Sequence, residues 1–309
     1  MNEEIGSAAW RKAIPERRDR LQSRALVWVV GALLVGLILH TTAFAWPIVA
    51  RFPGFVFGAL GISLMFVGVV FSLRAATPAG TACGGMICLL LTFWTGAFNE
   101  SFLRSGLTPL VLLFVLTFAA TRAGRQRKLK AGLAEGRKGR SAAQVIANLG
   151  VAGLASSWAG AAALLWCMRS AIHSYDAPLA LIGTVALAAL AEATADTVSS
   201  EIGQAFGGRP VMLTTMQRVD AGVDGAVSLL GTAAGVVAGA VVVLAGQWAL
   251  RLTPKNAVIA LAGGVAGLFF DSLLGATVER KGWLGNDLVN FASTLFAAGV
   301  SLGLMTAVS

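Results

Sequence analysis

The chain has 309 residues, of which 56% are hydrophobic and only 13% are charged. Soluble domains carry about 25% charged residues, so this composition excludes an ordinary soluble protein. The net charge of +9 would suit a nucleic-acid-binding protein, but its distribution along the chain indicates membrane topology instead. The three cysteines lie in apolar runs, and their odd number argues against a disulfide framework.

Long uncharged stretches predict transmembrane helices. They cover 25–50, 52–73, 75–99, 105–121, 141–168, 177–191, 225–250, 256–270 and 288–309. Six of the nine reach the ~20 residues that a helix needs to cross the hydrocarbon core, and the other three do so when a terminal polar residue is included. The sequence therefore predicts an all-α, polytopic membrane protein with about nine transmembrane helices. A basic tail, 1–24, precedes a single transmembrane domain, 25–309.

The basic residues predict the orientation of the helices. If all nine stretches cross, 19 of the 24 lysines and arginines fall on the side of the N-terminal tail, and 5 fall on the other side. Positive charge concentrates on the cytoplasmic side of membrane proteins. We therefore expect an integral membrane protein, of the inner or plasma membrane in a bacterium, with a cytoplasmic N-terminus. A basic loop over 122–140 and a loop over 195–224 that carries acidic motifs are expected on the same face.

Three aspartates beside small and hydroxyl residues interrupt or border the apolar runs. Asp196 lies in ADTVSSEIG, Asp224 in VDGAVSLLG and Asp271 in FFDSLLGAT. A carboxylate within or at the rim of a membrane span is costly, so it usually marks a substrate, ion or proton site. The topology places all three on the cytoplasmic side, which predicts a shared active site there.

The segment around Asp196 contains the groups that magnesium prefers. A helix over this segment places Asp196 and Ser200 on one face, with Glu201 about a third of a turn away. Magnesium takes one or two carboxylates together with phosphate oxygens and water, and Asp196 with Glu201 or Asp224 would supply them. The structural alternative is that these acids cap helix ends and pair with Arg209 or Arg218.

Other polar segments predict contacts to phosphate or ribose. Asp224 falls near the expected start of a helix, with Ser228 one turn on, and free N–H groups at such a start suit either a carboxylate cap or a bound phosphate. In NDLVN, Asn286 and Asn290 are one turn apart and Asp287 lies beside them, where capping is again an alternative.

The segment from Thr121 to Gly150 combines a basic cluster with a polar start of a span. On the cytoplasmic face the basic residues would attract anionic lipid head groups. Arg140, Gln144 and Asn148 recur every four residues, and amides that face a membrane interior need partners. We expect this stripe to line the same pocket as the acids.

Together these segments resemble the integral membrane family that includes plant phytyl-phosphate kinase and the animal transmembrane protein 19 group, known as domain of unknown function 92. The resemblance extends from about Gly54 to the C-terminus. It is most specific in ATRAGRQRK (120–128), AAQVIAN (142–148), ADTVSSEIG, DGAVSLLGTAAG (224–235), DSLLGAT and NDLVN.

The resemblance implies a phosphotransferase, a kinase that moves a phosphoryl group from a nucleoside triphosphate, CTP or another, to a prenyl monophosphate such as phytyl phosphate. The product would be the diphosphate, and Mg²⁺ would be required. Asp196, Glu201 and Asp271 are the expected catalytic and magnesium-binding residues. Those expected to bind the substrate and nucleotide are Arg122, Arg125, Lys128, Arg140, Gln144, Asn148, Ser200, Asp224, Ser228, Asn286, Asp287 and Asn290.

The alternative is an ion- or proton-coupled transporter or lipid flippase that uses the same acids. Transporters are often built from inverted repeats with broken helices, whereas here the acidic motifs have no counterparts before Arg122. The expected partners are thus a prenyl phosphate, a nucleoside triphosphate and membrane lipids, without nucleic acid.

Overall fold

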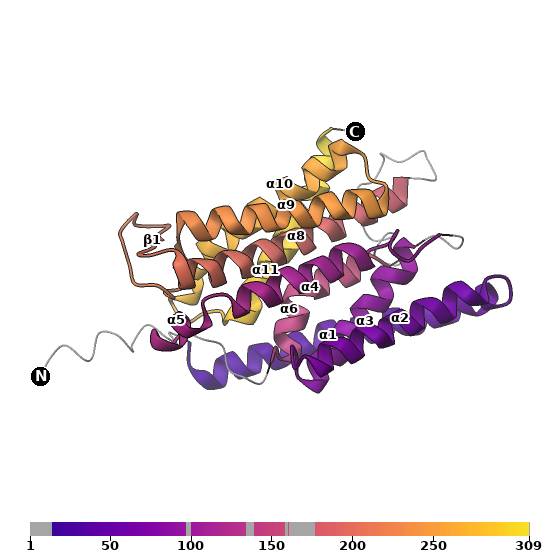
Figure 1. Cartoon of the computed structure of the whole chain (residues 1–309), viewed down its shortest axis with the longest axis horizontal. Helices are drawn as coiled ribbons and strands as arrows, with labels where there is room; N and C mark the ends of the chain where they lie inside the picture. Colours follow the sequence, from indigo (N-terminus) through magenta and orange to yellow (C-terminus); the bar gives the residue numbers. More distant parts are fainter. Residues whose placement is uncertain (1–13, 97–99, 134–138, 158–159, 161–176, 309) are drawn as a thin grey trace, which may run out of the picture.

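The computed structural model describes residues 14–96, 100–133, 139–157, 160 and 177–308, which form a bundle of helices (Figure 1). The first part of the predicted basic tail and most of the second half of the predicted span 141–168 lie outside these residues. The helices are α1 (Glu16–Val49), α2 (Pro53–Ser72), α3 (Pro78–Thr95), α4 (Leu107–Arg122), α5 (Arg125–Lys130), α6 (Ala142–Ala155), α8 (Ala177–Phe206), α9 (Leu229–Leu250), α10 (Pro254–Leu274) and α11 (Asn286–Ala307). A π-helical turn, η1 (Gly275–Glu279), extends α10.

The helices confirm the predicted polytopic membrane protein. Within the described residues, α1, α2, α3, α8, α9, α10 and α11 are long and apolar enough to cross a membrane, and α4 and α6 are shorter apolar helices. Each of the nine predicted stretches overlaps one of these helices.

Local sequence signals explain where several helices begin. Proline occupies the first turn of α2, α3 and α10, where its missing N–H removes no helical hydrogen bond. The Thr77 hydroxyl caps α3 by accepting from the Gly80 N–H at 3.2 Å. At α6, Ser141 and Gln144 form a reciprocal capping box.

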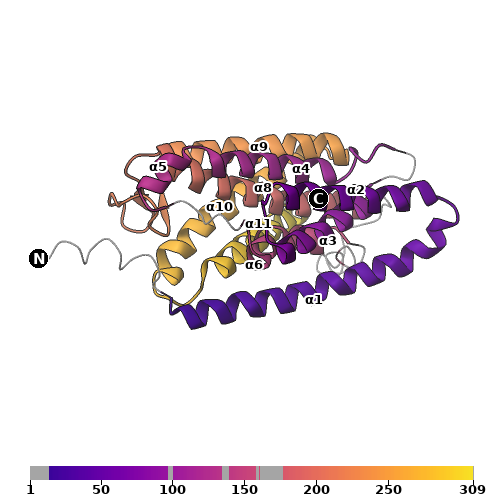
Figure 2. The same cartoon turned by 60° about the horizontal axis from the view of Figure 1, so that its bottom comes forward.

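Helix α8 is the centre of the bundle, since it packs against α4, α6, α9, α10 and α11 (Figure 2). It continues through Asp196 to Phe206, so the loop predicted over 195–224 was wrong for its first part. The reason is that α8 is surrounded by protein rather than lipid, so polar residues can continue the helix where neighbouring helices surround them.

Glycines bring α9 directly onto α8. A β-carbon at Gly235 would lie 2.4 Å from the Ala195 carbonyl oxygen, and one at Gly231 would lie 2.5 Å from that of Ser199. No side chain fits in that space. This close backbone approach, typical of helices packed in membranes, fixes the turn of α8 that carries Asp196.

Two short elements lie together at one end of the bundle (Figures 1 and 2). The strands β1 (Val211–Met212) and β2 (Ala226–Val227) pair antiparallel after α8, and α5 lies within the predicted basic loop 122–140. Helix α9 starts after Ser228, whose hydroxyl accepts from the Gly231 N–H at 3.1 Å. Ser228 is therefore the cap of α9, so the alternative that Asp224 caps this helix is wrong, while the predicted turn that leads into the helix is present.

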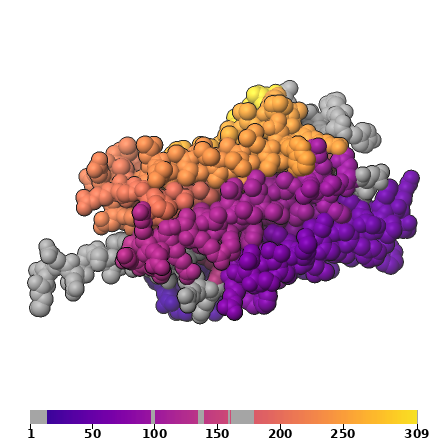
Figure 3. Space-filling model, in the orientation of Figure 1, coloured from indigo at the N-terminus to yellow at the C-terminus, as the bar shows by residue number. Residues whose placement is uncertain are grey.

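Helices α2, α4 and α9 lie side by side on one face of the molecule (Figure 3), and all three expose large apolar side chains there. Leu64 of α2, Val115 of α4 and Leu244 of α9 are each more than half exposed. Soluble monomers rarely expose apolar patches of this extent, which agrees with a surface that faces lipid tails.

Candidate functional site

A polar pocket of about 270 Å³ opens between α6, α8, α10, α11 and the β1–β2 segment. It brings together most of the residues singled out in the sequence, from segments up to about 150 positions apart. The predicted residues that line this polar pocket are Arg140, Gln144, Asn148, Asp196, Ser200, Glu201, Asp224, Ser228, Asp271, Asn286 and Asn290. The fold therefore brings the three acidic motifs together in one pocket, as predicted.

Two carboxylates from neighbouring helices lie close together in the polar pocket. Asp196 of α8 and Asp271 of α10 are close enough to interact directly. The Asp271 Oδ1 atom is buried and accepts no hydrogen bond from the described residues. A buried acceptor of this kind loses its hydration without compensation, so the site is suited to a positively charged ligand.

Glu192 lies one turn before Asp196 and continues the acidic stripe into the bundle. It is 1% exposed, and neither of its carboxylate oxygens has a hydrogen-bond partner among the described residues. Gly267 of α10 makes room for it, because a β-carbon there would lie 2.5 Å from the Glu192 Cγ. The spacing of four between Glu192 and Asp196 predicts that both lie on one stripe of the helix, although Glu192 was not among the predicted site residues.

Asp224 is held over the polar pocket by a glycine. Gly225 has φ +74°, and a β-carbon there would lie 2.1 Å from the Ala276 backbone nitrogen, so the turn rests directly on η1. Burial raises the pKa of Asp224 from 3.8 to about 6, and the nearby Arg280 guanidinium opposes that rise. Asp224 therefore changes charge at mildly acidic pH.

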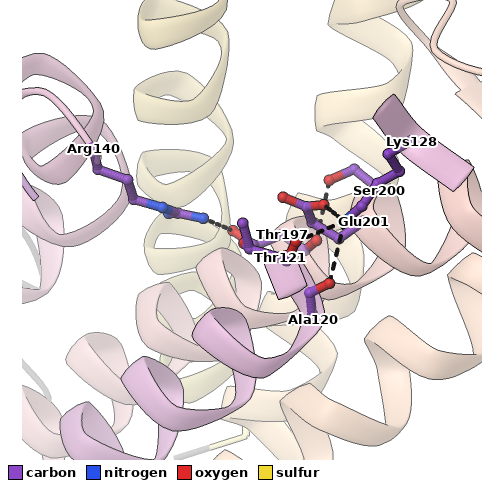
Figure 4. Close-up of polar contacts among 7 residues, drawn as sticks. All are labelled: Ala120, Thr121, Lys128, Arg140, Thr197, Ser200 and Glu201. Carbon is purple, nitrogen blue, oxygen red and sulfur yellow. Dashed lines mark hydrogen bonds and ion pairs between the residues drawn. The ribbon is translucent and has the colours of Figure 1, made fainter. Parts of the chain in front are cut away.

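Arg140 is fixed by its backbone, and it forms no salt bridge with the part of the chain that the structure describes. Its N–H donates to the Ala75 carbonyl and its carbonyl accepts from the Thr77 N–H, both at 2.9 Å. Gly139, at φ +72°, permits this contact, since a β-carbon there would lie 2.7 Å from the Arg74 carbonyl oxygen. The guanidinium extends towards α8, where Nη2 lies 3.4 Å from the Thr197 hydroxyl (Figure 4). Its charge also acts on Asp196.

Glu201 is engaged by Lys128 in a buried ion pair (Figure 4). The Lys128 Nζ donates to Glu201 Oε2, to the Thr121 carbonyl at 2.9 Å and to the Ala120 carbonyl at 3.4 Å. Lys128 is 1% exposed and Glu201 is 8% exposed. This pair fastens α5 and the end of α4 to α8, and it neutralises one of the three carboxylates predicted to bind magnesium.

A second cavity, of about 390 Å³, lies beside the polar pocket and is mainly apolar. We call it the apolar cavity; it runs between α2, α3, α4 and α6. The predicted residues Arg122, Arg125 and Lys128 line this cavity instead of the polar pocket. Arg140 and Asn148 line both, so they form the wall that the two spaces share.

Asp287 is the one predicted residue that lines neither space. Its Oδ2 accepts from the Ser23 hydroxyl of α1 at 2.6 Å, which ties α11 to the first helix. Conversely, Glu279 of η1 lines the polar pocket although it was not predicted. Its position eight residues after Asp271, close to two helical turns, was the available signal.

The residues of the polar pocket fit a divalent cation only in part. Within the described part of the chain, no three Asp, Glu, His or Cys side chains form a ready-made metal cluster. The predicted set of Asp196, Glu201 and Asp271 is therefore not a closed cage. Asp196 and Asp271 remain, and one buried Asp271 oxygen has no partner among the residues that the structure describes. Magnesium takes one or two carboxylates when phosphate and water supply the other ligands.

Comparison with known proteins finds one matching family and several similar membrane or chloroplast proteins. The model of the family "Integral membrane protein DUF92" matches residues 61–298. An uncharacterised membrane protein of Methanocaldococcus jannaschii is 42% identical over 116 residues, which are 38% of this chain and 48% of the relative. An uncharacterised membrane protein of Synechocystis is 26% identical over 200 residues, 64% of this chain and 73% of the relative. The chloroplast protein VTE6 of Arabidopsis thaliana is 30% identical over 207 residues, 66% of this chain and 58% of the relative. No solved structure matches.

Proposed function

Because this chain belongs to the DUF92 family of integral membrane proteins, we propose that it is a Mg²⁺-dependent prenyl-phosphate kinase. It would transfer a phosphoryl group from a nucleoside triphosphate, CTP or another, to a prenyl monophosphate such as phytyl phosphate. The resemblance to the family of phytyl-phosphate kinase supports the reaction class. The position of the apolar cavity beside the polar pocket supports a lipid phosphate as the substrate.

The main support for the proposal is the wall that the apolar cavity and the polar pocket share. The apolar cavity and the acidic polar pocket share Arg140 and Asn148 as a common wall. A kinase for a lipid phosphate needs an apolar space for the tail, a polar space for the nucleotide, and a junction where the two phosphates meet. A guanidinium at such a junction can bind phosphate oxygens of both partners.

The transfer requires positioning more than proton chemistry. An oxygen of the prenyl phosphate attacks the γ-phosphorus, the bond from that phosphorus to its bridging oxygen breaks, and the nucleoside diphosphate leaves. The attacking oxygen is already ionised, so no general base is needed. In this proposal Arg140 offsets phosphate charge while Asn148, Asn286 and Asn290 orient phosphate or ribose, since catalysis of this kind rests on alignment and electrostatic stabilisation.

Magnesium would be held by Asp196 and Asp271, with donor phosphates and water as its other ligands. When bound, it would neutralise charge on the transferring group. Asp224 and Ser228 also line the polar pocket and would contact the nucleotide. In this reading Glu201 serves mainly to hold Lys128, because their charges already offset each other.

The proposal places the polar pocket at the cytoplasmic face, where nucleoside triphosphates are found. Its support is the concentration of 19 of 24 basic residues on the side of the N-terminal tail.

A turnover assay tests the proposal. Purified protein in lipid nanodiscs is given phytyl phosphate, Mg²⁺ and each of the four common nucleoside triphosphates, and diphosphate is measured by mass spectrometry. We expect product with at least one donor, none without Mg²⁺, and a loss of about 100-fold or more in Asp196→Asn, the scale of removing one electrostatic contact in a transition state.

Asp220→Asn is the matched control, since Asp220 is exposed and lies outside the polar pocket. If no combination of prenyl phosphate and donor yields product, the proposal is wrong. A pH-dependent flux across proteoliposomes that Asp196→Asn abolishes would instead favour the transporter.

A further inference from the structure

The lining of the apolar cavity changes from charged to apolar along its length. At one end lie Arg74 after α2, Arg122 at the end of α4, Arg125 of α5, and Arg140 before α6. Among the described residues none of these four arginines forms a salt bridge. Away from this end, the lining includes Val70, Phe66, Leu113 and Leu110. The cavity therefore offers positive charge at one end, which we call the mouth, and hydrocarbon contact away from it.

Aromatic side chains line one wall of the apolar cavity, starting beside an arginine at the charged end. The Arg122 guanidinium lies over the Phe118 ring, 3.5 Å from its centroid. Phe118 stacks on Phe114 at 5.4 Å between centroids, and Phe114 meets Phe66 edge-on at 5.8 Å. The cation–π contact holds Arg122 at the mouth, and the rings form a continuous apolar wall from the mouth towards the far end.

The depth of the cavity matches one leaflet of a bilayer. Along α4 the lining extends from Arg122 to Leu110, which is a rise of about 18 Å at ~1.5 Å per residue. Half of the hydrocarbon core is about 15 Å. The volume of about 390 Å³ lies within the ~300–1,000 Å³ of typical small-molecule sites. We therefore expect the cavity to take one chain rather than the two chains of a phospholipid.

We propose that the apolar cavity binds the prenyl chain of the substrate, with its phosphate among Arg74, Arg122, Arg125 and Arg140, and that Gly84 and Phe114 set the length of chain that fits. This inference deepens the proposed function and rests on it. Gly84 lies one turn below Gly80 on α3, and a β-carbon there would be 3.9 Å from both Phe66 and Val145. A larger side chain at Gly84 would project where the chain must pass, whereas removing the Phe114 ring would enlarge the space below.

Two variants change chain-length preference in opposite directions. Gly84→Leu raises KM for phytyl phosphate by about tenfold or more, because excluding two methylene groups from an apolar site weakens binding by about that factor. It leaves KM for dimethylallyl phosphate, whose chain ends near the mouth, within about twofold of the unaltered protein. Phe114→Ala raises the rate with prenyl phosphates longer than phytyl relative to phytyl itself. Gly61→Leu is the control, since nothing lies within 4 Å of a β-carbon at Gly61 on the outer side of α2.

A binding measurement separates this inference from the proposed reaction. A photoactivatable phytyl phosphate, with its reactive group at the end of the chain, is crosslinked to the full chain in nanodiscs, and the adduct is located by mass spectrometry. We expect adducts on Phe66, Leu110, Leu113 or Phe114, displaced by phytyl phosphate but not by phytol or by phosphatidic acid. Labelling is reduced in Gly84→Leu and retained in Gly61→Leu.

Each outcome decides between the two claims. If the protein phosphorylates phytyl phosphate but the adducts map outside the apolar cavity, the chain-site inference is wrong and the kinase proposal stands. If the adducts map to the cavity but no diphosphate forms, the kinase proposal fails and a prenyl-phosphate site remains. Displacement by phosphatidic acid as well as by phytyl phosphate would show a general anionic-lipid site and would overturn the inference.

Discussion

The Lys128–Glu201 pair tests whether Glu201 stabilises the fold through Lys128 or binds the metal ion. Replacing Lys128 with Met leaves the Glu201 carboxylate buried without its cation. Loss of one partner from a buried pair costs about 3–5 kcal/mol. Replacing Glu201 with Gln is milder, because Lys128 keeps the Ala120 and Thr121 carbonyls as acceptors; we expect about 1.5–3 kcal/mol, the range for a hydrogen bond to a charged group. The double variant is expected to be more stable than Lys128→Met alone.

Thermal unfolding in one detergent measures these differences, since 1 kcal/mol shifts Tm by about 2–4 °C in domains of ~150–250 residues and by less in larger ones. Arg251→Met, which breaks the Arg251–Glu100 pair, is the control: the Arg251 side chain is 64% exposed, and exposed pairs contribute about 0–1 kcal/mol. The expected order of Tm is Arg251→Met above Glu201→Gln above Lys128→Met. If Glu201→Gln and Lys128→Met both keep the Tm of the unaltered protein while Glu201→Gln alone abolishes Mg²⁺-dependent turnover, Glu201 is a metal ligand and our assignment is wrong.

Three further predictions follow from other parts of the fold. The raised pKa of Asp224 means that folding favours the neutral form of this carboxyl group. Its contribution to stability is therefore present below pH 3.8 and is lost as the pH rises through about 6. Between pH 4 and 7, Tm should fall less in Asp224→Asn than in the unaltered protein, and equal falls would contradict this. Glu192→Met replaces a buried carboxylate, whose oxygens have no hydrogen-bond partner among the described residues, with an apolar side chain of similar length and should raise Tm in metal-free buffer; a lower Tm would show that Glu192 has a stabilising partner. Gly235→Leu should prevent a monodisperse protein in size-exclusion chromatography, because its β-carbon would meet the Ala195 carbonyl at 2.4 Å, while Gly36→Leu, with nothing within 4 Å, should elute normally.

The sequence was sufficient to predict the helices and the gathering of the acids. Apolar length alone identified the membrane spans, and the parity of the crossings placed Asp196, Asp224 and Asp271 on one side. Both predictions depend only on the apolar length of each segment and on the number of segments that precede it in the chain. The outcome is a polar pocket lined by all three aspartates.

What the sequence could not supply were partners that are distant in the chain. Lys128 meets Glu201 across 73 positions, and Ser23 meets Asp287 across 264. No spacing rule indicates such contacts, so Glu201 and Asp287 were assigned to ligands rather than to these bonds. The end of α8 was misplaced for a related reason: hydropathy treats a helix as exposed to lipid, whereas α8 is enclosed by other helices.

Manganese binding measured by electron paramagnetic resonance tests the central claim most directly. Mn²⁺ replaces Mg²⁺ at oxygen sites, and it is titrated into the full chain in nanodiscs with a non-hydrolysable nucleoside triphosphate analogue. We predict one bound ion that is lost in both Asp196→Asn and Asp271→Asn and retained in Asp220→Asn. Unchanged binding in the first two variants would contradict the account, because the ion would then lie away from the carboxylates that α8 and α10 bring together.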